Sequence, residues 1–347
     1  MGPSWRQSIL AGLALAAATA FAALPAQAET VLKFSAWLPV QHWLNAGVMK
    51  PWADAVDEAT QGRVRIEFLP KVVGSAQAQF DVVRDGLADV SIIVNGYTPG
   101  RFTLLEMGEL PFLGTEAVVM SPAFYRIYEE YLSKFDEFDG VHVLSTFTTA
   151  SGHIYTTKVE IDDLADLKGL KLRSPLGSTA PIMTALGAVP VQKPSTEAYE
   201  LLSTGVIDGT FLSREGAKGN KILELVPFLT VVPGGLYNAI LSVIVNQAKW
   251  DAITPEDQAA IMKVSGEALA LKIGQAYQKA DEDGLEAIKA AGHTVTVANP
   301  KLLGEMKEAL KPIESAWIEK AKAKGLDNPE EVLAQFRAEL QAGAKAN

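Results

Sequence analysis

The residue in this sequence best suited to hold an anionic ligand is an arginine at the end of a short apolar strand. In GLKLRSP (residues 169–175), Leu170 and Leu172 flank Lys171, and a Ser-Pro pair ends the run, which predicts a strand with Arg173 at its carboxyl end. Open α/β sheets bind ligands at this end of their strands. A guanidinium donates two parallel hydrogen bonds to a carboxylate, which makes a ligand carboxylate one candidate partner of Arg173, although a strand-end arginine on its own is usually a surface or salt-bridge residue.

Motifs for catalysis or metal binding do not occur in the sequence. No two of the four histidines have the spacing of helical metal ligands, and there is no HExxH, GxSxG or P-loop pattern. The chain has no cysteine, so it has neither disulfides nor thiolate metal ligands. We therefore expect a binding protein without cofactor or metal. An exported enzyme with a similar cleft, its site assembled from distant residues, is the alternative.

The first 28 residues have the pattern of a secretory signal. Arg6 gives a basic start, an alanine-rich apolar run follows, and Ala26-Gln27-Ala28 offers small residues for cleavage. The apolar run is shorter than the roughly 20 residues of a membrane span. We predict cleavage after Ala28, export to the periplasm and no membrane insertion of the mature chain. The full sequence has a net charge of −10, which disfavours binding to nucleic acid or anionic lipid.

Two segments share one pattern of strand, connection, helix and strand. The first contains GRVRIEFLP and FDVVRDGLADVSIIV, and the second contains GLKLRSP and AYELLSTGVIDGTFL. In each, a glycine (Gly86, Gly205) ends the helix, and an aspartate (Asp89, Asp208) three residues later leads into the next strand. Such alternation predicts parallel sheet covered by helices, and two units predict two similar α/β lobes.

A long helical pattern follows these units. Thr254-Pro255-Glu256 is a helix start signal, and apolar residues recur at helical spacing until Gly292. Unbroken, this helix would be ~57 Å long at 1.5 Å per residue. We therefore expect it to lie across both lobes, with Gly266, Gly274 and Gly284 as places where it could bend.

Four blocks, in order, resemble the solute-binding subunits of TRAP transporters, the tripartite ATP-independent periplasmic family often named after dicarboxylate uptake (DctP-like). They are GSAQAQFDVVRDGLADV, GRFTLLEMGELPFL, DLADLKGLKLRSP and ALGAVPVQKPSTEAYELLSTGVIDG. The resemblance runs from about Val31 into the long helix. It implies the two-lobed α/β fold of periplasmic binding proteins, a ligand cleft between the lobes and a long helix spanning both. It also implies that Arg173 pairs with a ligand carboxylate.

The resemblance suggests further ligand residues. His153 stands near a second arginine of many relatives, and either binds ligand or packs under a loop. Arg214 falls near a tryptophan of one subgroup, and is otherwise a surface cation beside Glu215. Asn246 either faces the cleft or caps a turn. The full set of predicted ligand-binding residues is Arg173, Trp37, Asn95, His153, Leu212, Ser213, Arg214, Tyr237 and Asn246.

We assign residues 29–151 to lobe I, with 241–275 returning to it. Residues 152–240 form lobe II, with 276–347 packing on it and across both lobes. The expected ligand is a small organic acid: Trp37, Trp43, Phe211 and Tyr237 would suit an aromatic or branched acid, whereas Arg173 with Arg214 would suit a dicarboxylate. The expected partners are the membrane permease subunits of a TRAP importer. A component that presents its ligand to a sensor remains an alternative.

Overall fold

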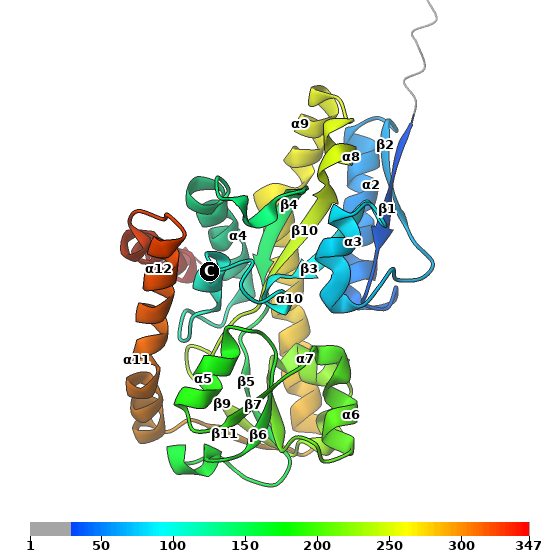
Figure 1. Cartoon of the computed structure of the whole chain (residues 1–347). Helices are drawn as coiled ribbons and strands as arrows, with labels where there is room; N and C mark the ends of the chain where they lie inside the picture. The colour runs from blue at the N-terminus through cyan, green and yellow to red at the C-terminus, as the bar shows by residue number, and fades with distance from the viewer. Residues whose placement is uncertain (1–28, 347) are drawn as a thin grey trace, which may run out of the picture.

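The computed structural model describes residues 29–346, which form two β-sheets with helices around them (Figure 1). The predicted signal at residues 1–28 lies outside the described residues. The first sheet has the strand order β2-β1-β3-β10-β4 and the second β11-β9-β5-β8-β6-β7. We call the first sheet with its covering helices lobe I and the second lobe II. This two-lobed α/β architecture confirms the predicted fold class.

Both sheets are mixed. In lobe I, β1 pairs in parallel with β2 and β3, whereas β10 is antiparallel to β3 and β4. In lobe II, β6 pairs in parallel with β7 and β8, and β5 is antiparallel to β8 and β9. The strands are β1 (Thr30–Ser35), β2 (Val64–Phe68), β3 (Val90–Val94), β4 (Val141–Thr148), β5 (His153–Thr156), β6 (Lys171–Ser174), β7 (Val189–Gln192), β8 (Gly209–Leu212), β9 (Phe228–Val231), β10 (Ile240–Asn246) and β11 (Thr294–Val297).

Helices cover the sheets and the seam between them (Figure 1). They are α2 (Lys50–Ala59), α3 (Gln79–Arg84), α4 (Ala117–Ile127), α5 (Thr179–Ala185), α6 (Ala198–Ser203), α7 (Arg214–Gly219), α8 (Gln247–Asp251), α9 (Pro255–Val264), α10 (Gly266–Ala290), α11 (Pro300–Ala323) and α12 (Pro329–Ala346). Within residues 29–346, no helix combines the length and apolar character that a membrane span needs.

The repeated aspartates make the same hydrogen bonds in both lobes. The Asp89 carboxylate accepts from the Lys33 backbone N–H at 2.8 Å, and the Asp208 carboxylate accepts from the Lys171 N–H at 2.9 Å. Each aspartate N–H donates to the carbonyl of the same lysine, at 2.9 Å and 2.7 Å. The aspartate thus ties the incoming strand to its parallel neighbour. The shared sequence pattern therefore marks a shared structural unit, in which Arg173 of β6 corresponds to Ser35 of β1.

The predicted long helix is divided into α9 and α10. The break lies at Ser265, whose ψ is −144°, and at Gly266, whose φ is +50°. The Ser265 hydroxyl accepts a 3.0 Å hydrogen bond from the Trp52 indole, so its side chain fixes the break to α2. The break thus falls at Gly266, one of the three glycines named as possible bends, and a long helix across both lobes is confirmed: α10 packs on α4 of lobe I and α7 of lobe II.

Two glycines let α10 approach both lobes closely. A Cβ at Gly274 would lie 2.5 Å from the carbonyl oxygen of Ala117, and one at Gly284 would lie 2.5 Å from the backbone of Arg214. These glycines therefore serve close packing rather than bending.

The chain crosses between the sheets twice before α10, at residues 149–152 and at 232–239. The segment after α10 contacts both lobes. Strand β11 pairs with β9 of lobe II and α11 packs on α5, whereas α12 packs on α4 of lobe I. The limits proposed for the lobes remain a prediction at the level of single residues.

Candidate functional site

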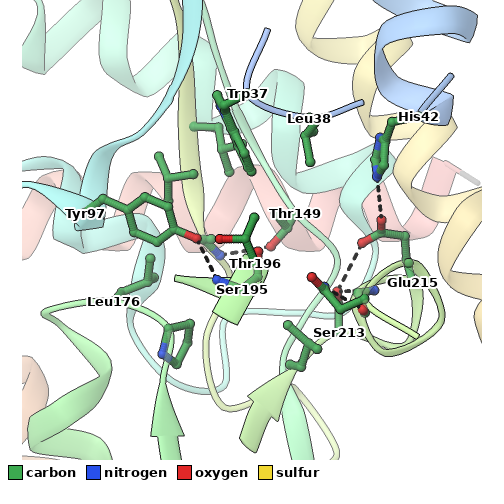
Figure 2. Close-up of a pocket in the computed structure, with 18 of the residues that line it drawn as sticks. Trp37, Leu38, His42, Tyr97, Thr149, Leu176, Ser195, Thr196, Ser213 and Glu215 are labelled. Atoms are coloured by element: carbon green, nitrogen blue, oxygen red, sulfur yellow. Dashed lines mark hydrogen bonds and ion pairs between the residues drawn. The ribbon is translucent and has the colours of Figure 1, made fainter. Parts of the chain in front are cut away.

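A cavity of about 340 Å³ lies between the lobes (Figure 2). Its apolar wall comes from lobe I, lobe II, the crossing segment and α10. The aromatic and aliphatic lining residues are Trp37, Leu38, Val94, Tyr97, Leu176, Leu212, Tyr237, Leu241 and Tyr277. The polar and charged lining residues are His42, Thr149, Arg173, Ser195, Thr196, Ser213, Glu215, Asn220 and Lys221, and they include one group around Arg173 and one around Glu215.

Arg173 is fully buried, and the three nitrogens of its guanidinium have different surroundings. Nε donates to the carbonyl oxygens of Lys193 (2.9 Å) and Pro194 (3.2 Å). Nη1 donates to the Thr210 hydroxyl (3.1 Å) and the Phe211 carbonyl oxygen (3.2 Å). Nη2 is buried and has no hydrogen-bond partner among the residues described. The residues that hold Nε and Nη1 all belong to lobe II.

No carboxylate within residues 29–346 forms a salt bridge with Arg173. The hydroxyls of Tyr97 and Tyr237 support its charge, and Glu197 contributes less. Burial lowers the pKa of Arg173, yet an arginine stays protonated in proteins. A buried cation is costly without an anion. This end of the cavity therefore suits a ligand carboxylate.

The second polar place is centred on Glu215, at the start of α7. Its Oε1 accepts a 3.0 Å hydrogen bond from the Trp43 indole of lobe I and lies 3.7 Å from His42 Nε2. Its Oε2 lies 3.4 Å from the Ser213 hydroxyl. Burial, the largest cause, raises the pKa of Glu215 to about 7, and burial lowers that of His42. Glu215 therefore joins the two lobes at this end of the cavity.

Other contacts also close the cleft. The Ser195 backbone N–H donates to the Tyr97 hydroxyl at 3.2 Å, and the Gly177 N–H donates to the Gly96 carbonyl at 3.2 Å. The Ser178 hydroxyl donates to Glu109 at 2.5 Å. Each of these pairs joins one residue of lobe II to one of lobe I, so the structure represents a closed arrangement.

Five of the nine predicted ligand residues line the cavity. Arg173 and the lobe II residues Leu212 and Ser213 do so, together with Trp37 and Tyr237. The Trp37 indole donates to the Ile92 carbonyl oxygen at 2.9 Å, which holds its ring at the end of β1. Their contact with ligand remains a prediction.

The other four lie outside this wall. Arg214 pairs with Asp281 of α10, at 2.5 Å from Nη2 to Oδ2, so this salt bridge already occupies its guanidinium. His153 is buried and accepts from the Val232 N–H at 3.3 Å, so packing under a loop describes it.

Asn246 and Asn95 form hydrogen bonds outside the lining of the cavity. Asn246 caps α8 by accepting from the Lys249 N–H at 3.1 Å, and its amide donates to the Val83 and Arg84 carbonyls. Asn95 is buried and accepts from the Ser242 hydroxyl at 3.0 Å. Turn capping therefore describes Asn246. Asn95 lies just after β3 and contacts Ser242 of β10 through its oxygen, and its Nδ2 is buried without a hydrogen-bond partner among the residues described.

Several lining residues had not been singled out from the sequence. Glu215 had been considered only as a neighbour of Arg214, although an acid in the first turn after a strand is a visible signal. Ser195 and Thr196 follow β7 in KPSTEAY, one strand away from Arg173, and the parallel pairing of β6 with β7 brings them to the same edge. Leu176, Thr149 and Tyr277 carry no comparable signal.

Comparison with known proteins agrees with this geometry. The DctP family, "Bacterial extracellular solute-binding protein, family 7", matches residues 34–321. The outer membrane transporter protein TsaT of Comamonas testosteroni is 30% identical over 333 residues, which are 94% of this chain and 98% of that protein.

Two crystal structures are similar over almost the whole described fold. A TRAP periplasmic solute-binding protein from Bordetella bronchiseptica, with bound (R)-mandelate and (S)-mandelate, is 37% identical with a TM-score of 0.87, covering 90% of this chain and 99% of that one. One from Rhodoferax ferrireducens T118, with copurified benzoate, is 30% identical with a TM-score of 0.84, covering 91% and 99%.

The family consists of periplasmic solute receptors and not of enzymes, which confirms the prediction of a binding protein. The family match over most of the chain, the two-lobed fold and the cavity between the lobes lead to one assignment. This chain belongs to the TRAP solute-binding proteins of the DctP type, family 7 of the bacterial extracellular solute-binding proteins.

Proposed function

We propose that this protein captures a small aromatic carboxylate in the periplasm and delivers it to the membrane subunits of a TRAP importer. Arg173 would pair with the carboxylate, and Trp37, Tyr97 and Tyr237 would surround the ring. The observation that carries the proposal is the unpartnered Nη2 of a fully buried Arg173 beside a largely apolar cavity. A guanidinium that is already held in place can donate a hydrogen bond to a carboxylate oxygen with little further ordering.

Three observations favour an aromatic monocarboxylate over a dicarboxylate. The cavity, at about 340 Å³, is at the small end of the ~300–1,000 Å³ typical of small-molecule pockets and is lined mainly by apolar side chains. Arg214, the expected partner for a second carboxylate, is already paired with Asp281. Two similar proteins carry mandelate and benzoate.

Export and assembly complete the proposal. A signal at residues 1–28 would direct the chain to the periplasm, where the mature protein would start at Glu29. The closed, liganded form would then dock on the permease subunits, and closure would exclude water from the ion pair.

A thermal-shift screen of organic acids followed by calorimetry tests the proposal. A ligand at 100 times its dissociation constant adds ~2.7 kcal/mol of stability, so binders should stand out clearly. We expect benzoate and mandelate to stabilise the protein and succinate and malate to leave it unchanged. Stabilisation by the dicarboxylates alone would overturn the choice of ligand class. Turnover of a bound acid into product would contradict a purely binding role.

A further inference from the structure

The cavity has a cationic end and an acidic end. Arg173 is held through the carbonyls of Lys193 and Pro194, next to Ser195, whose N–H donates to the Tyr97 hydroxyl. Figure 2 shows this Tyr97–Ser195 contact on one side of the cavity and the His42–Glu215 contact on the other. A ligand whose carboxylate meets Arg173 would therefore extend toward Glu215.

Most donors around Glu215 point at one of its two oxygens. Oε1 accepts from the Trp43 indole at 3.0 Å. His42 Nδ1 accepts from the Leu44 backbone N–H at 3.3 Å, so a neutral His42 carries its proton on Nε2, which lies 3.7 Å from the same Oε1. Two donors of lobe I thus face Oε1.

The second oxygen of Glu215 is much less occupied. Its one hydrogen-bond partner within residues 29–346 is the Ser213 hydroxyl, at a long 3.4 Å. The side chain is 12% exposed, and both Glu215 and Ser213 line the cavity. A carboxylate oxygen accepts more than one hydrogen bond, so Oε2 has free acceptor capacity. Glu215 lines both this cavity and a second one beside Trp43 and Lys279.

We propose that Glu215 determines ligand specificity by accepting a hydrogen bond from a hydroxyl group on the ligand, so that the protein prefers hydroxylated aromatic acids. The inference rests on the proposed function, since Arg173 must orient the ligand. Glu215 also disfavours a second carboxylate at its end of the cavity, because two like charges in a site with little water repel strongly. Selection of the hydroxyl and rejection of the dicarboxylate thus come from one side chain.

Calorimetry with a matched series of acids tests the preference. Benzoate is compared with ortho-, meta- and para-hydroxybenzoate at about pH 8.5, above the pKa of about 7 for Glu215. We expect at least one hydroxylated isomer to bind about tenfold or more tightly than benzoate, as sites built to hydrogen-bond a hydroxyl discriminate strongly against analogues without it. Binding of benzoate at least as tight as that of all three isomers would overturn the inference.

Two substitutions separate the roles of charge and acceptor. Glu215→Leu removes both oxygens, so the preferred isomer and benzoate should bind within about threefold of each other. Glu215→Gln removes the charge, so terephthalate, a benzoate with a second carboxylate, should bind at least about fivefold more tightly than it binds the wild type. A hydroxyl preference that survives Glu215→Leu would show that another residue provides it.

Trp43→Phe is the control for the contact between the lobes. Glu215 also holds the closed form through Trp43, so a change at Glu215 weakens closure for every ligand. Trp43→Phe removes that hydrogen bond and leaves both Glu215 oxygens in place. It should weaken benzoate and its hydroxylated analogues by the same factor, with their ratio unchanged within about twofold. A lost ratio in this variant would assign the preference to closure rather than to Glu215.

Different results would refute the proposed function and the role of Glu215. If none of the aromatic acids binds the wild type, the proposed function itself is wrong. If they bind and Arg173→Ala abolishes binding, but the hydroxyl preference is absent or independent of Glu215, the proposed function stands and the role of Glu215 is refuted.

Discussion

Nε of Arg173 donates a 2.9 Å hydrogen bond to the backbone carbonyl oxygen of Lys193, in the segment that follows β7. On the other side, Nη1 reaches the hydroxyl of Thr210 in β8. The two strands that flank β6 thus fix the plane of the guanidinium and leave Nη2 without a partner among the residues described. A group fixed in this way loses little conformational freedom when a ligand binds, which favours affinity.

Replacement of Arg173 by alanine should abolish most ligand binding. The variant leaves a ligand carboxylate unpaired in a closed site, and loss of one partner of a buried charge pair costs ~2–5 kcal/mol. Affinity for benzoate should therefore fall roughly 30-fold to several-thousand-fold in calorimetry. Arg173→Lys should also bind poorly, because an ammonium group cannot reproduce the planar fork. Affinity of the alanine variant within about threefold of wild type would mean that Arg173 is purely structural.

The same alanine variant should also be less stable without ligand. Acceptors on Lys193, Pro194 and Thr210 lose the guanidinium as donor, whereas the Phe211 carbonyl keeps the Thr210 hydroxyl, and each unsatisfied buried polar group costs ~1–3 kcal/mol. Removal of a buried charge that has no salt-bridge partner offsets part of this loss. We expect a net loss of about 1–3 kcal/mol in urea unfolding. Unchanged stability would indicate that water replaces the guanidinium fully.

The fold was predictable because its pattern is local and repeated. Strand–helix alternation and the paired Gly86/Asp89 and Gly205/Asp208 signals indicated two α/β units, and the aspartate hydrogen bonds give the physical reason for the repeat. Gly266 also marked a possible bend in the long helix, and the helix breaks there. The hydrogen bond that fixes Ser265 at this break was not predictable, because its donor, Trp52, is more than 200 residues away in the sequence.

The site was predictable only in part, for a related reason. Arg173 and Trp37 stand at strand ends, which sequence patterns reveal. The partners of Arg214 and Glu215 come from other parts of the chain, namely α10 and the loop after β1. To predict a buried ion pair or a hydrogen bond between the lobes, one must know which surfaces of the fold contact each other. The spacing of residues along one strand does not contain this information.

Arg214 should matter for stability and not for ligand binding. Asp281 is 3% exposed at its side chain, and loss of its partner in Arg214→Ala should cost about 3–5 kcal/mol. The backbone N–H groups of Arg214 and Glu215 still donate to Asp281, so the lower end is expected. Calorimetry should show affinity for benzoate within about threefold of wild type.

Arg126→Ala is the matched control, since Arg126 also pairs with two acids but is 42% exposed. Its loss should cost at most about 1 kcal/mol. A more than tenfold loss of ligand affinity in Arg214→Ala, with the fold intact, would restore Arg214 to the binding site.

The exported protein should begin near Glu29. The basic start and apolar run of residues 1–28 predict removal by signal peptidase after Ala28. Intact-mass spectrometry of the protein from a periplasmic extract measures this directly. A mass that includes Met1 would show that the segment is retained.

Ligand binding should narrow the cleft. Contacts between the lobes, such as Trp43 with Glu215 and Ser195 with Tyr97, exist in this closed arrangement and must break when it opens. Small-angle scattering should therefore give a smaller radius of gyration with a saturating aromatic acid than without. An unchanged radius alongside tight binding would mean that the cleft is already closed in the absence of ligand.

Glu109 should make the protein less stable as the pH rises. It is buried, with the Ser178 hydroxyl and the Ile240 N–H as hydrogen-bond donors and Glu106 as a nearby acid, and burial raises its pKa from 4.5 to about 8. Between these two values the unfolded chain releases the proton and the folded chain keeps it. The folded state then binds more protons, so stability falls from about pH 5 to pH 8 and levels off above.

Glu109→Gln removes this contribution and should flatten the decline of the unfolding free energy with pH, measured by urea unfolding. Glu137 and Glu215, whose pKa values are also raised to about 7, remain in both proteins and cancel in the comparison. Glu224→Gln, at an exposed glutamate, should leave the wild-type slope unchanged. Parallel profiles for wild type and Glu109→Gln would show that Glu109 is ionised in the folded protein throughout this range.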